Sequence, residues 1–320
     1  MIYIIILNWN GYNDTIDCLE SIRQNSYNNY KLVIVDNDSS DNSIEILKSY
    51  ISEKKINAYL IENNDNSGFS KGCNIGIDYA ICQADCDYIW LLNNDTIVDT
   101  CAIEKLVNFF EKNNDIDVIT PQINYYDNKT LIWNCGGRIS LLGFRKYFFP
   151  KKEEKILPKK EYLKVSFITN CASFFRKDFF SGGYRLDERF FFGEEDFSLC
   201  LYAKKKKMKM ACLLTSKIYH KVSSSIQKQS YVDDNKIFVY YINRLVDMKL
   251  FYRNKLLFWC YKRIYFPYIK HTIKNKISNV TDFLRLLDFA SSEYNSVDKN
   301  LFERIMKYGY KSYKKNSILE

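Results

Sequence analysis

The sequence predicts an α/β fold in which a mainly parallel central sheet has helices on both faces, followed by a C-terminal helical extension. Strand-length apolar runs alternate with helical patterns through the first 120 residues, and this alternation is typical of a parallel sheet covered by helices. The run Tyr88–Asn93 carries no charge, as expected of a strand buried on both faces. The 320 residues, 47% of them apolar, are enough for one large core and an appendage.

The apolar runs predict the strands, and the segments between them predict the helices. We expect strands at residues 3–7, 31–36, 56–61, 88–93 and 118–120. We expect helices at residues 15–24, 43–52, 74–84 and 100–113, with Asp41, Asn42 or Ser43 as the N-cap of the second. After Pro121 the pattern breaks into loop-rich sequence, and the charged residues 151–160 are interpreted as a mobile connection or a surface excursion.

Basic charge is concentrated in the last part of the chain. Residues 221–320 hold 19 Lys and Arg against 9 Asp and Glu, which leaves 28 against 29 in residues 1–220. Residues 255–270 mix aromatic and aliphatic residues with cations, without the roughly 20 apolar residues that a membrane span needs. The pattern predicts either a helix packed on the main domain or a surface helix that brings residues 236–275 to a membrane. No nucleic-acid-binding motif occurs, so nucleic acid is not an expected partner.

Two features indicate the compartment. The ten cysteines include no Cys-x-x-Cys pair, which favours reduced thiols over a disulfide framework or a zinc finger. Met1 leads directly into a strand-like run without a basic leader, so we expect no secretory signal. The expected location is cytoplasmic, peripheral on the inner face of the cell membrane if the basic segment binds there. Oligomerisation is left open.

Polar residues follow the predicted strands, at the sheet edge where ligands of parallel sheets bind. They are Asn8, Asp36, Asp38, Gly68, Lys71, Asn74, Asn93, Asn94 and Asp95. Taken singly, Asp36 and Asp95 would also suit a turn or a helix cap. The glycines and Lys71 open a helix, where backbone amides attract an anion. This loop fits neither the Walker pattern nor the dinucleotide fingerprint.

Short motifs stand in a characteristic order between residues 2 and 250. They are Leu7-Asn-Trp-Asn-Gly11, Val35-Asp-Asn-Asp-Ser-Ser-Asp41, Gly68-Phe69 with Gly72 and Asn74, Leu91-Leu-Asn-Asn-Asp-Thr96, Gly136-Gly137, Phe191-Phe-Gly-Glu-Glu-Asp196 with Leu199-Cys-Leu201, and Tyr219-His-Lys-Val-Ser-Ser224. The set resembles the family 2 glycosyltransferases of bacterial polysaccharide assembly, especially their rhamnosyltransferase-like group. This resemblance implies the GT-A nucleotide-diphospho-sugar transferase fold. The catalytic domain would cover residues 1–235, with a nucleotide-binding half of about 1–120 and an acceptor half of about 121–235, and the extension would cover 236–320.

The resemblance also implies roles for the residues that bind the donor, a nucleotide-diphospho-sugar. Asp36 would read a pyrimidine base, and Asp95 would hold a divalent metal, Mn²⁺ or Mg²⁺. Such an ion stabilises the charge of a leaving nucleoside diphosphate. Asn93 stands where the family's usual metal motif has its first acidic residue, so we expect His220 as the second ligand, although a lone histidine is more often structural. Other implied donor contacts are Asn8, Asp38, Gly68, Lys71, Asn74, Asn93 and Asn94.

Inversion at the anomeric carbon needs a carboxylate that takes the proton of the acceptor hydroxyl. By its position in the family motif, Asp196 is the expected base, with Glu195 as a supporting acceptor contact or an alternative base. Acidic residues here would also suit a helix N-terminus. Asn170 and Ser198 stand where relatives often have Gly and Asp, which leaves the identity of the acceptor open.

We therefore expect a metal-dependent, inverting glycosyltransferase that acts on a growing cell-surface glycan or a lipid-linked acceptor. The resemblance to the subgroup favours dTDP-rhamnose as the donor, and UDP-linked galactofuranose, GlcNAc or another hexose are alternatives. A non-catalytic nucleotide- or glycan-binding relative would be favoured if Asp95, Asp196 or His220 were turned away from a common cleft. A dehydrogenase would need the dinucleotide glycine fingerprint, which the sequence does not have.

Overall fold

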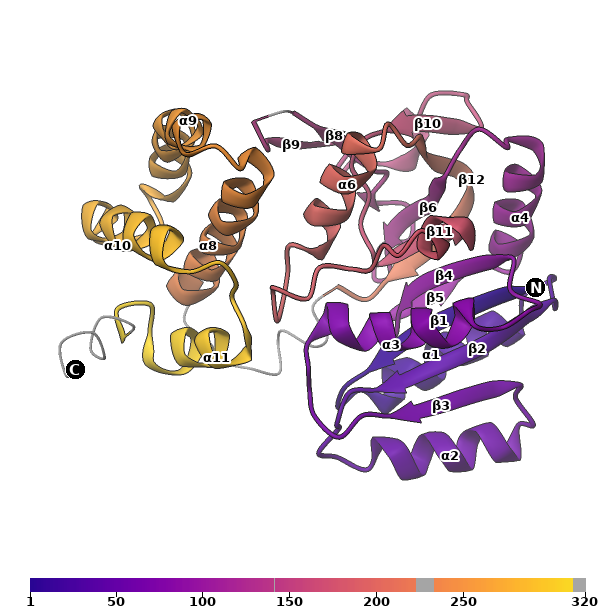
Figure 1. Ribbon diagram of the computed structural model, residues 1–320. Coiled ribbons are helices and arrows are strands. Elements are labelled where there is room, and N and C mark those ends of the chain that lie inside the picture. The colour runs from indigo at the N-terminus through magenta and orange to yellow at the C-terminus, as the bar shows by residue number, and fades with distance from the viewer. Residues whose placement is uncertain (141, 223–232, 313–320) are drawn as a thin grey trace.

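The computed structural model describes residues 1–140, 142–222 and 233–312. One large twisted sheet with helices on its faces forms one side of the molecule, and four C-terminal helices gather on the other side (Figure 1). The α/β fold predicted from the sequence is confirmed. All ten cysteines are free.

The first half of the sheet is parallel, as predicted. Strands β4, β1, β2 and β3 lie side by side in that order, all parallel. The elements are β1 (Ile2–Asn8), α1 (Tyr12–Arg23), β2 (Tyr30–Asp36), α2 (Ser43–Glu53), β3 (Ala58–Glu62), α3 (Phe69–Ile81) and β4 (Tyr88–Asn93). Helix α3 begins at Phe69, five residues before the predicted start. It directly follows Gly68, the last residue of the preceding loop, which has a φ of 87°. At α2, Asn42 is the N-cap without a side-chain bond, and Asp41 accepts from the Ser43 amide.

The second half of the sheet mixes parallel and antiparallel pairs. Strand β11 lies antiparallel between β4 and β6, and β12 runs parallel to β6. The elements are β5 (Thr96–Val98), α4 (Ala102–Lys112), β6 (Val118–Tyr125), β7 (Ile132–Asn134), β8 (Gly137–Ile139), β9 (Arg145–Tyr147), the 3-10 turn η1 (Glu154–Ile156), β10 (Tyr162–Val165), β11 (Ala172–Arg176), α5 (Asp178–Ser181), α6 (Glu195–Lys205) and β12 (Met210–His220).

The predicted end of a strand at Thr120 was wrong, because β6 continues through Pro121 to Tyr125. Proline has no amide hydrogen for the ladder and is tolerated where pairing is irregular. The register of β12 shifts between Leu213 and Lys217, next to its pairing with Pro121. The charged segment that follows is a surface excursion, and Glu154 of η1 pairs with Lys217 of β12 at 2.7 Å.

Both faces of the sheet are buried, which explains the uncharged strands. Along β1, Ile4 and Ile6 pack with Leu19 of α1 on one face. On the other face, Tyr3 and Ile5 belong to the cluster that contains the buried residues of α3 and α6. Since the sheet interior holds apolar side chains, the polar residues at the strand ends mark its edge.

The C-terminal helices are α8 (Asp233–Tyr252), α9 (Lys255–Ile273), α10 (Val280–Glu293) and α11 (Lys299–Tyr308). The α8 residues Phe238, Ile242 and Leu245 are fully buried in the same cluster as Phe197 of α6. The extension therefore shares a core with the sheet, and the boundary predicted at residue 235 falls in the first turn of α8. Among the described helices, none is long and apolar enough to cross a membrane.

Candidate active site

The carboxyl ends of β1 and β2 hold a network around Asp36. The Asp36 carboxylate is fully buried and accepts from Asn8 Nδ2 at 2.7 Å, from the Ser39 amide at 2.9 Å and from Ser39 Oγ at 2.8 Å. Thr15 Oγ1 donates to Asn8 Oδ1 at 2.7 Å, which fixes the Asn8 amide in turn. Asp38 follows with a φ of 62° and is exposed. Asp36 is thus held rigidly at the sheet edge.

The start of α3 lies against the segment that precedes α6. A Cβ built on Gly68 would lie 2.3 Å from the Phe191 carbonyl oxygen, so only glycine allows this approach. Lys71 is exposed in the first turn of α3. The Asn74 side chain makes its hydrogen bonds within the protein. Its Nδ2 donates to Leu186 O at 2.9 Å and to Glu188 Oε1 at 2.8 Å, and its Oδ1 accepts from the Leu186 amide. We therefore assign Asn74 to holding this loop and leave it out of the donor-binding set.

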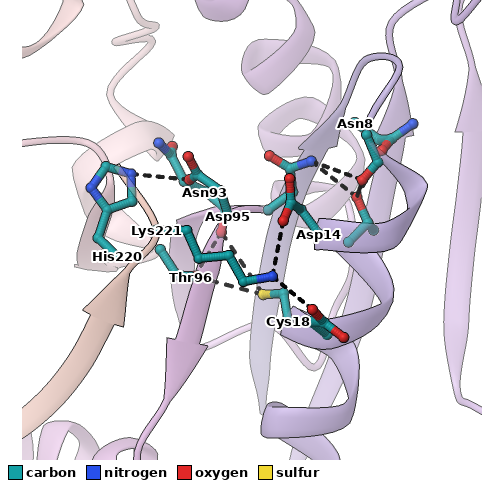
Figure 2. A network of polar contacts seen from close by, with 12 residues as sticks. Asn8, Asp14, Cys18, Asn93, Asp95, Thr96, His220 and Lys221 are labelled. Carbon is teal, nitrogen blue, oxygen red and sulfur yellow. Dashed lines mark hydrogen bonds and ion pairs between the residues drawn. The ribbon is translucent and has the colours of Figure 1, made fainter. Parts of the chain in front are cut away.

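Asp95 and His220 face each other across the end of the sheet (Figure 2). Asp95 lies in the turn between β4 and β5, and His220 is the last residue of β12, paired with Thr96 of β5. His220 Nε2 lies 3.0 Å from Asp95 Oδ1, and both residues are buried. The Trp133 ring packs edge-on against the imidazole, with ring centroids 4.4 Å apart.

Lys221, which was not expected at the site from the sequence, holds this pair in place. Its amide donates to Asp95 O at 2.9 Å, and its Nζ donates to Asp14 at 2.9 Å and Asp17 at 2.7 Å on α1 (Figure 2). Asn94 Nδ2 donates to Thr15 Oγ1 at 3.1 Å. The end of β12 and the β4–β5 turn are both tied to α1. In the sequence, only the position of Lys221 next to His220 could have indicated its role. Residues 223–224 of the same motif lie outside the described residues.

The residues at this point fit a divalent cation. His220 Nε2 and Asp95 Oδ1 lie within hydrogen-bond distance of each other, and an imidazole nitrogen and a carboxylate oxygen are both ligands that a divalent ion such as Mn²⁺ accepts. Asn93 Oδ1 is buried without a hydrogen-bond partner. Over residues 1–140, 142–222 and 233–312, no cluster of three or more His, Cys, Asp or Glu side chains could hold a metal by itself. Oxygens of a bound diphosphate would have to complete the coordination.

The first turn of α6 carries two acidic residues, Glu195 and Asp196, named here the α6 carboxylates, and Glu194 is the N-cap residue that precedes them. Asp196 Oδ1 accepts from the Asn170 amide at 2.6 Å. Although Glu195 and Asp196 keep some solvent contact, the protein around their carboxyl groups desolvates them. Desolvation, with the neighbouring Asp196 charge, raises the pKa of Glu195 to about 8. Desolvation also raises the pKa of Asp196, against the lowering effect of the Asn170 amide. A raised pKa makes the ionised carboxylate a stronger base.

Helix α8 holds the segment that carries the α6 carboxylates. Glu194, in the left-handed conformation with a φ of 73°, forms a fully buried ion pair with Arg244. The Arg244 guanidinium lies 3.3 Å from the centroid of the Phe197 ring and donates to Gly143 O at 2.8 Å. Asn243 Nδ2 donates to Phe192 O at 2.9 Å. These contacts come from one helix and fix the backbone on which Glu195 and Asp196 are placed.

The same face of α8 makes a second set of contacts one turn later. Asp247 accepts from Ser198 Oγ at 2.8 Å and pairs with Arg189 at 2.9 Å. Arg244 and Asp247 were not expected at the site from the sequence. A signal for them was available in the sequence, because they are charged residues three positions apart in a largely apolar helical stretch.

Backbone hydrogen bonds of residues 170–171 connect the end of β4, next to Asp95, with the α6 carboxylates. Asn170 donates its backbone amide to Asp196, and the carbonyl of the next residue, Cys171, accepts from the Asn93 amide at 2.9 Å. Neither side-chain atom of Asn170 has a hydrogen-bond partner, nor has Asn93 Oδ1. A buried polar group without a partner costs about 1–3 kcal/mol. A polar ligand placed here would satisfy both amides.

Comparison with known proteins gives one family. The family model described as "Glycosyl transferase family 2" matches residues 3–182. "Minor teichoic acid biosynthesis protein GgaB" of Bacillus subtilis (strain 168) is 28% identical over 209 residues, which are 64% of this chain and 21% of GgaB. "Glycosyltransferase GlyG" of Streptococcus pneumoniae serotype 4 is 27% identical over 127 residues, 40% of each chain. The chain thus spans only part of the length of these relatives.

Solved structures agree on the fold. GalNAc-T7 in complex with UDP, GalNAc and Mn²⁺ superposes with a TM-score of 0.62 at 16% identity, over 98% of this chain and 57% of that one. Residues 1–349 of S. aureus TarS with UDP-GlcNAc superpose with a TM-score of 0.57 at 13% identity, over 98% and 92%. At such identities the likeness concerns the fold alone, and it confirms the predicted GT-A type.

Proposed function

The chain belongs to glycosyl transferase family 2, and from this premise we propose that it is an inverting glycosyltransferase using a pyrimidine nucleoside-diphospho-sugar. One observation supports this most. The buried Asp95–His220 pair, suited to a diphosphate-bound cation, and the α6 carboxylates, suited to proton transfer, are joined through residues 170–171. Glycosyl transfer needs both kinds of group on opposite sides of one sugar.

The donor would lie along the carboxyl ends of β1, β2 and β4. Asp36, held by Asn8 and Ser39, would accept a hydrogen bond from the base. The N-terminal end of α3, which carries Lys71 in its first turn, would attract the diphosphate. Asp95 and His220 would hold the divalent cation, Mn²⁺ or Mg²⁺, and when bound it would supply positive charge to the leaving diphosphate.

The proposed chemical step is a single displacement. Asp196 removes the proton of the acceptor hydroxyl, and that oxygen forms a bond to the anomeric carbon as the bond from this carbon to the diphosphate oxygen breaks. Attack from the face opposite the leaving group inverts the configuration. The proton ends on Asp196. The raised pKa of Asp196 favours this transfer, because a stronger base takes the proton more completely in the transition state. Asn93 and Asn170 would bind sugar hydroxyls with their unused amide groups.

For the acceptor we propose a growing cell-surface glycan, free or lipid-linked. GgaB, a teichoic acid biosynthesis protein by name, supports a cell-wall glycan. For the donor sugar, dTDP-rhamnose remains our proposal from the motif resemblance. The GT-A neighbour crystallised with UDP-GlcNAc makes UDP-GlcNAc the main competitor.

A screen of donor hydrolysis tests the proposal. Purified protein is incubated with dTDP-rhamnose, UDP-GlcNAc, UDP-galactofuranose and UDP-galactose, with Mn²⁺ or with a chelator, and release of the nucleoside diphosphate is measured. We expect release from one of these donors, only with the metal. A non-catalytic nucleotide-binding relative would bind UDP or dTDP and release nothing from any donor, even with mixed glycan acceptors added.

A further inference from the structure

Helix α9 has two unlike faces. On the inner face, Tyr261, Tyr265 and Ile269 are fully buried against the neighbouring helices, and the Tyr261 and Tyr265 rings stack with centroids 4.9 Å apart. On the outer face, Leu256 is 67% exposed and Ile264 is 49% exposed. The inner face accounts for the packing of α9. The outer face is apolar without any covering element among the described residues.

The exposed apolar residues form a row. Leu256, Cys260, Ile264 and Tyr268 are all exposed and recur every fourth residue, a spacing that places them on one side of a helix. Trp259 lies beside this row and is also exposed, with the guanidinium of Arg263 4.6 Å from the centroid of its ring. A tryptophan and an arginine stacked at the border of an apolar row are typical of a helix that lies at a membrane interface.

The charge around this row has one sign. Residues 248–281 contain eight Lys and Arg and no Asp or Glu. Lys262 is paired with Asp288 of α10 at 2.6 Å, and Lys249 donates to three backbone carbonyls. The remaining six are exposed and form no ion pair within residues 233–312: Arg253, Lys255, Arg263, Lys270, Lys274 and Lys276.

The positive charge distinguishes between two partners of the apolar row, a second copy of the chain and a lipid surface. If a second copy of the chain covered it with the same face, two surfaces that both carry cations and no acidic residues from 248–281 would meet. An anionic lipid surface supplies a counter-charge for each cation and accepts the apolar side chains at headgroup depth. The α9 helix carries several cations, and no described helix is long and apolar enough to span a membrane. Helix α9 would therefore lie in the plane of the lipid surface.

We propose that the outer face of α9 docks on an anionic membrane surface. Leu256, Trp259 and Ile264 enter the headgroup layer, and the flanking cations contact lipid phosphates. This corrects the segment expected from the sequence, residues 236–275, because the inward-facing residues of α8 are buried in the core. Docking needs neither donor nor turnover, so its test does not depend on the proposed glycosyl transfer.

Vesicle flotation tests the proposal. The full chain is mixed with vesicles of phosphatidylcholine alone or of phosphatidylcholine with phosphatidylglycerol, at low and at high salt. We expect flotation with the phosphatidylglycerol vesicles, weakening as salt screens the cations. The double variant L256E/I264E should bind at least about tenfold more weakly. R263E/K270E should lose the preference for anionic vesicles.

Ile156 provides a matched control, because it is 47% exposed on η1, outside the C-terminal helices. I156E should float like the wild type, and thermal unfolding of every variant should show that the fold is kept. The proposal is wrong if the wild-type chain stays unbound to phosphatidylglycerol vesicles at low salt, or if I156E weakens binding as much as L256E/I264E. It is also wrong if the wild type is a dimer in light scattering that L256E/I264E dissociates, without vesicle binding by either protein.

Discussion

The strand-end residues and the α6 carboxylates form two parts of the candidate site, and they are held in place by different means. Asn8 and Asp36 end strands β1 and β2, and Asp95 follows β4. Asn8 and Asp36 bind each other, the Ser39 loop and Thr15 of α1, and Asp95 is held by residues 220–221 at the end of β12, a strand of the same sheet. The α6 carboxylates depend on a helix far along the chain, where Arg244 meets Glu194. The part suited to donor binding therefore belongs to the sheet. The part suited to acceptor chemistry is completed by the C-terminal extension.

Asp196→Asn tests the chemical half of this comparison and has the largest expected effect. The Asn oxygen can still accept from the Asn170 amide, but the side chain no longer takes a proton. Turnover should fall by about 10²–10⁴-fold, as loss of a general base does, with unchanged donor affinity. Steady-state kinetics measure it. Glu195→Gln is the control and should be milder. If Glu195→Gln is the more damaging change, the base has been assigned one residue too late.

Arg244→Met tests whether the α6 carboxylates depend on α8. The change leaves Glu194 buried without its partner, and breaking a buried ion pair from one side costs about 3–5 kcal/mol. Urea unfolding should show this loss, with turnover reduced because the start of α6 moves. Arg285→Met is the control, since the Arg285–Asp282 pair is largely exposed and should contribute less than about 1 kcal/mol.

The double variant Glu194→Gln/Arg244→Met distinguishes a mispaired charge from a general packing defect. With both charges removed, much of the lost stability should return. A double variant as unstable as Arg244→Met alone would mean that the guanidinium acts by filling space over Phe197, and the ion pair would lose its assigned role.

Gly68→Ala tests the contact between the start of α3 and the segment that precedes α6. The added Cβ would lie 2.3 Å from the Phe191 carbonyl oxygen, and the φ of 87° is unfavourable for alanine. The free energy of unfolding should fall by about 1–3 kcal/mol. Gly182→Ala is the matched control, because its φ is −76° and nothing lies within 4 Å of the added Cβ. Equal effects of the two changes would show that the contact with Phe191 is not close in solution.

The pH dependence of stability tests the surroundings of Glu195 in the first turn of α6. Because the pKa of Glu195 is raised from 4.5 to about 8 in the folded protein, the folded state holds a proton that the unfolded state releases. The contribution of Glu195 to stability is therefore complete below about pH 4.5 and is lost as the pH rises towards 8. Glu195→Gln should flatten this decline in urea unfolding between pH 5 and 8. A decline of the same slope in the variant would place the titration elsewhere.

The strand-end residues could be predicted because local pattern determines them. An uncharged run followed by Asn93 and Asp95 indicates a buried strand and the point where it leaves the sheet, and parallel alternation places Asn8 and Asp36 at the same edge. The family resemblance added His220, and the structure brings it to Asp95 across 125 residues. Their roles remain predictions until they are measured.

The rest could not be predicted because it depends on contacts distant in sequence. Arg244 and Asp247 lie in the C-terminal extension and were not expected at the site, yet both are buried against the segment around α6. Asn74 was expected at the donor, but its amide holds residues 186–188. Pro121 suggested the end of a strand, and a shift in the register of β12 accommodates it instead. In each case the partner lies at least 49 residues away.

The central claim is that donor binding and proton transfer are divided between these two parts, and calorimetry tests it most directly. UDP and dTDP are titrated, with Mn²⁺ present, into the wild-type chain, Asp95→Asn and Asp196→Asn. We predict that Asp95→Asn weakens binding of the preferred nucleotide at least about tenfold, because loss of a carboxylate ligand weakens a shared metal site. Asp196→Asn should bind it like the wild type. Unchanged affinity in Asp95→Asn, or an equal loss in both variants, would contradict the claim.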